Sequence, residues 1–306
     1  MATQNEIREQ ITNQIIQSLE RGTTPWRRPW SSDPCAGAPK NAVSRRGYTG
    51  INPLVLQLAA ESHGFTSRYW ATYRQWEEKG FQVMKRPEHV RRGTWGTNIV
   101  FCKQFTKRTD ENTEEEDNKT FLTLRTFTVF NADQVTGGDI ERFRVGSTPI
   151  VASEIEGRFQ EAERVVAATG AEIRFGGSRA YCSLDQDYIQ MPPKSQFAVP
   201  DFWDTLFHEM THWTEHPSRL NWDRKIPEHT YALGEVIAEL GSCFLAGELG
   251  LPLNETLENH AAYLKDWLQQ MKADSRWIFR ATAQASRAAD FILSFSRVEE
   301  PEQVLA

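Results

Sequence analysis

One segment of the chain has the residue types and spacing of a metal-dependent hydrolase, the H-E-x-x-H stretch from His208 to His212. Residues four apart lie on one face of a helix, so His208 and His212 can bind a single metal ion. Glu209 then lies beside the remaining coordination position. A metal such as Zn²⁺ lowers the pKa of a bound water to about 7, and a neighbouring carboxylate can accept its proton. The segment therefore predicts a metallopeptidase-type site with Glu209 as the catalytic base.

The sequence around this motif favours a helix that is packed along one side. Pro200 stands where a first helical turn would begin, and apolar residues then recur at helical spacing. These residues are Phe202, Leu206, Met210 and Trp213. We expect this stripe to enter the core and the two histidines to face a cleft.

A third protein ligand is expected, and a later apolar segment at 234–246 offers two carboxylates. Glu235 and Glu239 lie one turn apart there, and unpaired buried carboxylates are costly. Two His and one Glu form a common catalytic zinc set that leaves the fourth position for water. His216 is a further candidate, but Pro217 predicts that the helix ends there, which favours a helix-end or surface position for His216.

The run from Glu239 to Pro252 resembles the third-ligand helix of ImmA/IrrE-like peptidases, in which a Glu precedes an apolar run ending in Leu-x-x-Pro. The resemblance implies that Glu239 is the third ligand and that Glu235 orients a ligand histidine. The reverse assignment stays open, because thermolysin-like enzymes place the metal carboxylate first and the orienting one four residues later. We expect Zn²⁺, with Mn²⁺ or another divalent metal as the alternative.

Composition sets the general class of protein. The chain has 306 residues, of which 39% are hydrophobic and 25% charged, as in ordinary globular proteins with room for two domains. No apolar run approaches the roughly 18 residues of a membrane span, and the start of the sequence predicts an amphipathic helix instead of a secretory signal. The four cysteines are scattered without a C-x-x-C pair. We therefore expect a cytoplasmic protein without a membrane partner.

Charge is distributed unevenly along the chain, whose net charge is -6. The stretch 1–109 holds about twice as many Lys and Arg as Asp and Glu, whereas the second half is acidic. Aromatic residues alternate with these cations, a combination that suits single-stranded DNA because cations follow the phosphates and aromatic faces stack on bases. No helix-turn-helix, zinc-finger or RRM pattern predicts sequence-specific duplex binding. The candidate DNA contacts are Trp26, Arg27, Arg28, Trp30, Arg45, Arg46, Tyr48, Trp70, Tyr73, Arg91, Arg92 and Trp95.

The two halves predict different architectures within an α+β protein. The first begins with an amphipathic helix capped by Thr3 and Glu6 and ends in β-rich alternation. A Gly-rich polar stretch follows, and a new helix is expected from Ser153. We predict an α+β single-stranded-DNA-binding domain at 1–135, a linker at 136–152 and a zincin-like metallopeptidase domain at 153–306.

The order of several short motifs resembles ArdC-type antirestriction proteins, whose N-terminal domain is also found joined to plasmid primases of the TraC type. In the first half the resemblance rests on Pro25-Trp26, Pro29-Trp30, Tyr48-x-Gly50-Ile51-Asn52, Trp70-x-Thr72-Tyr73-x-Gln75 and Val129-Phe130-Asn131-x-x-Gln134. In the second half it rests on Asp187-x-Ile189-x-Met191-Pro192, the His208 motif extended to Trp213, Arg219-Leu220 and Ala238-Glu239-Leu240-Gly241. The resemblance implies a plasmid-borne protein that binds single-stranded DNA and shields DNA entering a new host from restriction.

Other hypotheses remain open at this point. The protein could be a cytosolic zinc peptidase whose basic half recruits a protein substrate, or a DNA-coating protein with a docking domain in place of a peptidase. A protein substrate or a component of the restriction system is a candidate partner. Tyr263 and His260 are candidate hydrogen-bond donors to the oxyanion of amide hydrolysis, although Tyr263 and Trp267 are also spaced to pack a helix.

Overall fold

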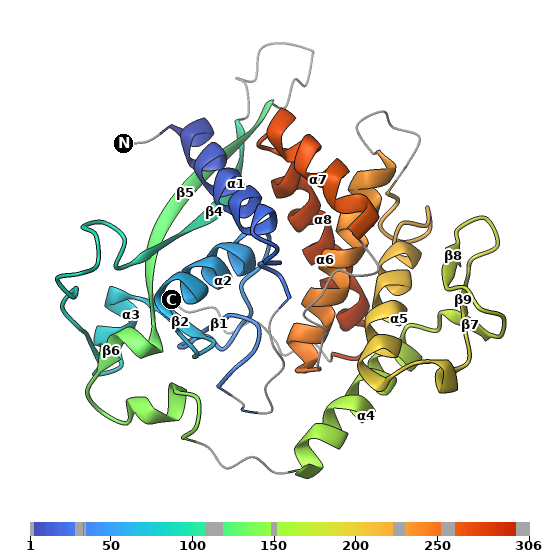
Figure 1. The fold of residues 1–306 in the computed structure, drawn as a ribbon, viewed down its shortest axis with the longest axis horizontal. Helices are drawn as coiled ribbons and strands as arrows, with labels where there is room; N and C mark the ends of the chain where they lie inside the picture. Colours follow the sequence, from blue (N-terminus) through green and yellow to red (C-terminus); the bar gives the residue numbers. More distant parts are fainter. Residues whose placement is uncertain are drawn as a thin grey trace.

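Both halves of the chain contain helices and strands, and a computed structural model describes residues 3–27, 33, 35–107, 119–147, 152–222, 230–251 and 261–297. The strands of the first half lie on one side of the molecule and the long helices of the second half on the other (Figure 1). This arrangement confirms the α+β fold class.

The first half combines short helices with one long antiparallel pair of strands. Its elements are α1 (Gln4–Glu20), β1 (Lys40–Asn41), α2 (Asn52–His63), β2 (Tyr69–Thr72), α3 (Tyr73–Glu78), β3 (Gln82–Val83), β4 (Thr97–Lys107), β5 (Lys119–Asn131), η1 (Ala132–Gln134), β6 (Val135–Thr136) and η2 (Ile140–Phe143).

The second half consists mainly of helices beside a small sheet. Its elements are α4 (Ala152–Ala168), β7 (Glu172–Phe175), β8 (Tyr181–Ser183), β9 (Tyr188–Met191), η3 (Lys194–Gln196), α5 (Val199–Trp213), α6 (Tyr231–Leu249), α7 (Ala261–Ala273) and α8 (Trp277–Ser294). No helix in the described part of the chain is both long and apolar enough to cross a membrane.

The first helix forms as its sequence predicts. Thr3 accepts a hydrogen bond from the backbone of Glu6 while the Glu6 side chain accepts one from the Thr3 backbone, a complete capping box. The apolar stripe of α1 is buried, including Ile15 and Leu19. Because α1 contacts α7, this stripe packs against the helices of the second half (Figure 1).

The largest hydrophobic cluster joins the two halves. Ile15 of α1 and Leu54 of α2 share it with Ile237 of α6, Trp267 of α7 and Ile278 of α8. The N-terminal helices therefore bury their apolar faces against the second half. The boundary at 136–152 stays a prediction, and a cut there would expose part of this cluster on both sides.

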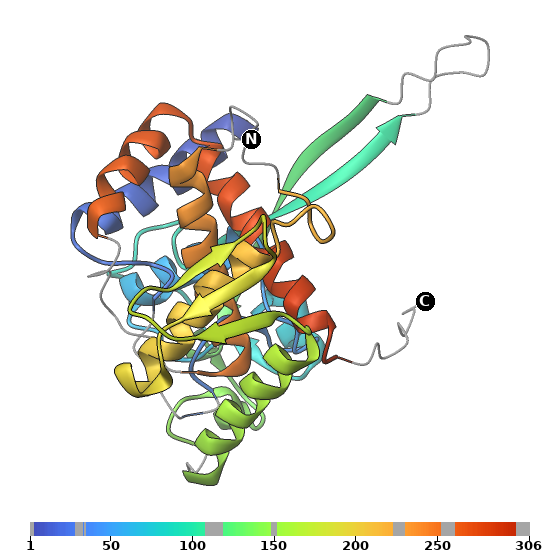
Figure 2. The same cartoon turned by 90° about the vertical axis from the view of Figure 1, so that its right-hand side faces the viewer.

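The first half also contains a four-stranded sheet in the order β1-β2-β5-β4. Strand β2 pairs with β1 on one side and with the last residues of β5, Val129 to Asn131, on the other. Beyond that point β4 and β5 pair with each other alone, from Asn98 opposite Thr128 to Lys107 opposite Lys119. This two-stranded extension projects away from the body of the molecule (Figure 2).

Candidate metal centre

Helix α5 presents the motif as its sequence predicts. The helix contains Pro200 in its first turn, where a missing N–H is tolerated. Leu206 and Met210 are buried in the second core cluster. His208 and His212 lie on another side of the helix, with ring centroids 4.8 Å apart. The two imidazoles thus lie edge to face, at an interplanar angle of 82°, along one side of α5.

Helix α6 supplies the third side chain because it packs closely against α5. A Cβ added to Gly241 would lie 2.5 Å from Oγ1 and 2.6 Å from Cγ2 of Thr211 on α5. Any larger residue at Gly241 would therefore push the helices apart. Thr230 caps the start of α6 by accepting a hydrogen bond from the backbone of Leu233, which holds the first turn and Glu235 in place.

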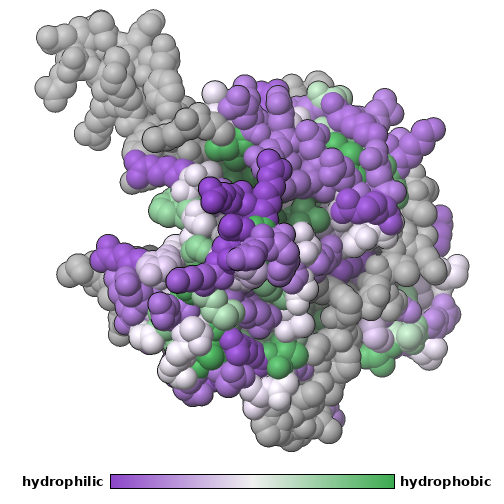
Figure 3. All heavy atoms as spheres, turned by 60° about the vertical axis from the view of Figure 1, so that its left-hand side comes forward, coloured by the Kyte–Doolittle hydropathy of each residue, from purple (hydrophilic) through white to green (hydrophobic). Residues whose placement is uncertain are grey.

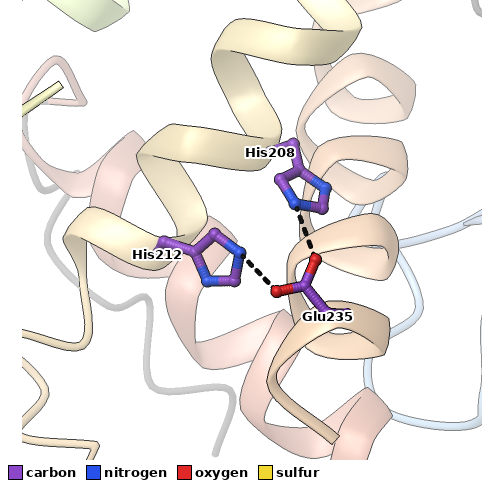
Figure 4. A group of neighbouring side chains, drawn as sticks. All are labelled: His208, His212 and Glu235. Atoms are coloured by element: carbon purple, nitrogen blue, oxygen red, sulfur yellow. Dashed lines mark ion pairs between the residues drawn. The ribbon is translucent and has the colours of Figure 1, made fainter. Parts of the chain in front are cut away.

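His208, His212 and Glu235 converge on one point (Figure 4). The distance from His208 Nε2 to Glu235 Oε2 is 3.6 Å, and that from His212 Nε2 to Glu235 Oε1 is 3.7 Å. These distances are too long for hydrogen bonds but match donor atoms that each lie about 2.1 Å from a shared cation. Among the described residues, His208, His212 and Glu235 form the one cluster of potential ligand side chains whose donor atoms are close enough to share a metal ion. The donor set fits a divalent metal.

The expectation that Glu239 is the third ligand is corrected by this geometry. Glu239 lies one turn beyond Glu235 and is completely buried. Its Oε1 accepts hydrogen bonds from Arg27 Nε at 2.6 Å and from Trp26 Nε1 at 3.1 Å, while Oε2 accepts one from Arg27 Nη2 at 2.8 Å. Both oxygens are therefore engaged by the first half of the chain, and Glu235 faces the histidines instead.

Arg27 also holds α5, through Asp204. Its Nη1 lies 2.9 Å from Asp204 Oδ2, and Ser242 of α6 donates to Asp204 Oδ1 at 2.7 Å. Asp204 lies one turn before His208, and Glu239 lies one turn after Glu235. A single buried guanidinium therefore bridges the two helices that carry the candidate ligands. We call Arg27, Asp204 and Glu239 the clasp.

A second carboxylate orients one of the ligand histidines. Glu215 Oε1 lies 2.7 Å from Nδ1 of His212, and Glu215 is buried. A carboxylate at Nδ1 favours a proton on that nitrogen and leaves Nε2 with its lone pair toward the metal. The sequence interpretation missed Glu215, although its place three residues after His212, in the turn that follows α5, could have indicated it.

The carboxylates around the site also affect protonation. Burial alone lowers the pKa of the His208 imidazole, but the nearby carboxylates of Glu235 and Glu209 raise it above its ordinary value. A protonated imidazole cannot bind a metal, so a proton and a metal compete for His208.

A cleft of about 680 Å³ opens over the three side chains. Glu209, which is largely buried, lines it together with Tyr231 and Tyr263. The two tyrosine hydroxyls are 3.2 Å apart, and this hydrogen bond raises the pKa of Tyr231. Tyr263 therefore lines the cleft, and its role as an oxyanion donor stays a prediction. Tyr231 is a residue of the cleft that the sequence interpretation did not name. His260 lies outside the described residues.

One wall of the cleft is the edge of the small sheet. The strands run in the order β7-β9-β8, so β8 has a free edge among the described residues, and Tyr181 and Cys182 of β8 line the cleft. Burial and the charge of Glu209 raise the pKa of Cys182 to about 12, which keeps it an inert thiol. An exposed edge beside a metal site can hold an extended peptide by strand addition.

The candidate DNA contacts fall into three groups. The structure corrects the expectation for Trp26, Arg27 and Trp70, because all three are buried and offer no surface to a base. Arg28 and Trp30 lie outside the described residues. The face of the molecule drawn in Figure 3 is mostly hydrophilic where its atoms are described. The other candidate contacts are exposed or half-buried. These are Arg45, Arg46, Tyr48, Tyr73, Arg91, Arg92 and Trp95.

Comparison with known proteins shows the same two parts in the same order. Residues 5–130 match the N-terminal domain of the anti-restriction factor ArdC, and residues 160–284 match the zincin-like metallopeptidase family. The fold and the site thus define a protein with an ArdC-type N-terminal domain and a zincin-like domain, which implies a divalent metal.

Solved structures and curated relatives extend this match over nearly the whole chain. A metal-free crystal structure of the antirestriction protein ArdC from plasmid R388 is similar with a TM-score of 0.74 and 37% identity, covering 95% of this chain and 98% of that one. A Mn(II)-bound structure of the same protein matches with a TM-score of 0.68. The chain belongs to the ArdC antirestriction family.

The curated relatives include proteins of very different length. Protein y4eC of Sinorhizobium fredii is 34% identical over 95% of this chain and 92% of its own length. A DNA primase TraC of Escherichia coli is 35% identical over 96% of this chain, but the chain spans only 28% of that primase.

Proposed function

We propose that this protein binds single-stranded DNA through its first half, carries a zinc-metallopeptidase centre in its second half, and protects incoming DNA from restriction in the cytoplasm of the host. The observation that carries the proposal is the convergence of His208, His212 and Glu235 beneath a cleft that also contains Glu209. Membership of the ArdC family supports the antirestriction role.

Each of these residues of the cleft can take a specific role in amide hydrolysis. His208, His212 and Glu235 would hold a divalent metal, which would supply an acidic water and polarise a carbonyl. Glu209 accepts the proton of the attacking water and delivers it to the leaving amine. The hydroxyls of Tyr231 and Tyr263 donate hydrogen bonds to the developing oxyanion. Zn²⁺ is the proposed metal because two His and one Glu are a typical catalytic zinc set, and Mn²⁺ is the alternative.

The free edge of β8 supports a second candidate function, that of a zinc peptidase whose first half recruits a protein substrate. An extended peptide can add to β8 and place its carbonyl in the cleft. A component of the restriction system is a candidate for such a substrate. The two functions differ in whether the first half binds nucleic acid.

The test is a titration of the full chain with single-stranded and duplex DNA of equal length, with metal content measured on the same samples. The full chain is required because the two halves share a hydrophobic cluster. The proposal predicts tighter binding to single strands, steep weakening with added salt and one metal per chain. Equal affinity for both DNA forms, or protein without metal after mild purification, would contradict it.

A further inference from the structure

The extension of β4 and β5 has a strongly asymmetric pattern of residues. Directly opposed residues of an antiparallel pair share a face, and successive residues alternate between faces. In the part of the pair whose side chains are described, one face carries Ile99 and Phe101 of β4 opposite Phe127 and Arg125 of β5. We call this set the ribbon face.

The opposite face has a different composition. It carries Asn98 and Val100 opposite Thr128 and Thr126. Every Phe and Arg of 98–101 and 125–128 therefore occupies the ribbon face, and these described positions include no acidic residue. Solubility alone does not explain why aromatic and cationic residues share one face of the strand pair.

Two aromatic rings of the ribbon face are open to solvent. Phe101 is 55% exposed and Phe127 is 46% exposed, although Phe is usually a core residue. Their ring centroids lie 6.3 Å apart at an interplanar angle of 82°, and Arg125 beside them is exposed. Toward the body of the molecule the same face ends at Val129, which is buried in a core cluster with Trp70. The strand pair is thus anchored in the core at Val129, while the rings of Phe101 and Phe127 remain exposed to solvent.

We propose that the ribbon face binds single-stranded DNA, with Phe101 and Phe127 stacking on unpaired bases and Arg125 contacting the phosphates. This proposal rests on the proposed function and assigns it a site. Same-face residues of a strand repeat every 6.6 Å or so, which lets aromatic and cationic positions alternate along an extended nucleic acid strand. Aromatic stacking with backbone cations is the usual chemistry of single-strand binding.

The composition of the ribbon face disfavours the other uses of such a ribbon. A two-stranded ribbon can enter the major groove of a duplex, but it then reads base edges with polar side chains, whereas this face offers Phe. An acidic run at 110–117 joins the two strands in sequence and lies outside the described residues. Because acidic residues repel phosphates, we place the DNA on the exposed positions Phe101, Arg125 and Phe127.

The test compares two double variants of the full-length, metal-loaded protein. Phe101→Ala/Phe127→Ala removes the exposed rings, and Thr126→Ala/Thr128→Ala on the opposite face is the matched control. Affinity for a fluorescent oligo-dT is measured by anisotropy over a range of salt concentrations, with thermal unfolding as a check of the fold. We expect the Phe variant to bind about tenfold more weakly or worse and the Thr variant to bind like the parent. Arg125→Gln should lower the slope of log affinity against log salt by about 0.7.

The outcomes separate this proposal from the proposed function. If the parent binds oligo-dT and the Phe variant binds as tightly as the Thr control, the ribbon face is not the site, while single-strand binding itself stands. If duplex DNA of the same length competes as well as oligo-dT, the stacking role is overturned. If the parent does not bind oligo-dT, the proposed single-strand binding of the whole protein is itself wrong.

Discussion

Arg27 and Glu239, which are 212 residues apart in sequence, form a buried two-point ion pair with Nε–Oε1 at 2.6 Å and Nη2–Oε2 at 2.8 Å. Paired forks of this kind are among the strongest charge-assisted hydrogen bonds. Because Arg27 also contacts Asp204, the pair holds α5 and α6 at the level just beside the candidate metal ligands. The first half of the chain therefore forms part of the support of the metal centre.

Removing one partner of the clasp should destabilise the whole protein. Arg27→Met leaves Glu239 buried without its cation, and such a change costs about 3 to 5 kcal/mol in the free energy of unfolding. Urea denaturation of the metal-free protein measures this loss. The double variant Arg27→Met/Glu239→Gln should be more stable than the sum of the two single losses predicts, because neither charge is then left alone. Strictly additive losses would show that the two side chains do not interact.

The close packing at Gly241 predicts a specific steric effect. Gly241→Ala places a methyl group against Thr211 and should cost about 1 to 3 kcal/mol of unfolding free energy, together with weaker metal binding as α6 moves from α5. Thr211→Ala removes both contacting atoms, so the double variant should recover part of each loss. Thermal unfolding and metal titration measure the two effects. If Thr211→Ala fails to restore Gly241→Ala, the contact is not the cause.

The ion pair between Asp187 and Arg219 predicts a pH-dependent contribution to stability. Arg219 Nη1 lies 3.0 Å from Asp187 Oδ2, and this hydrogen bonding lowers the pKa of Asp187. A lowered carboxyl pKa stabilises the fold above the ordinary value of 3.8, and the contribution disappears as pH falls through the lowered pKa. Since Asp187 is largely exposed, Asp187→Asn should cost only about 1 kcal/mol or less at pH 7.

Urea denaturation of the parent and Asp187→Asn between pH 7 and pH 3 checks this dependence. The difference between them should shrink as pH falls below about 4. A difference that stays constant to pH 3 would mean that the charge of Asp187 is not responsible.

Glu209 provides the test of the hydrolytic role. Glu209→Gln removes the base but keeps the shape of the cleft, so it should retain the metal and lose peptidase activity by at least about a hundredfold. Hydrolysis of denatured casein and metal content are measured on the same preparation. Activity equal to that of the parent would exclude Glu209 as the base. If the variant also protects DNA in a restricting host as well as the parent does, hydrolysis is not needed for protection.

Local sequence patterns predicted the elements well because their causes are local. The capping box of Thr3 and Glu6 and the spacing of His208 and His212 both act within a few residues. The motif residues Asn131 and Gln134 likewise proved structural, since both are buried and cap η1 together.

The third ligand could not be predicted in this way. Glu235 and Glu239 lie one turn apart on a buried helix, and both fit the requirement for a partner. The two glutamates differ in their contact with Arg27, which lies 212 residues earlier in the sequence than Glu239 and binds it. Some candidate DNA contacts were wrong for a related reason, because composition does not show that Trp26, Arg27 and Trp70 are buried. The alternation of the ribbon face was present in the sequence, but its meaning depends on the register of β4 and β5.

The identity of the metal site is tested most directly by titrating Zn²⁺ into the metal-free parent, Glu235→Gln and Glu239→Gln, at a temperature where circular dichroism shows all three folded. We predict that Glu235→Gln binds at least about a hundredfold more weakly than the parent, because losing even an outer carboxylate costs 10- to 100-fold. Glu239→Gln should stay within about tenfold of the parent. Retained affinity in Glu235→Gln together with lost affinity in Glu239→Gln would contradict the site described here.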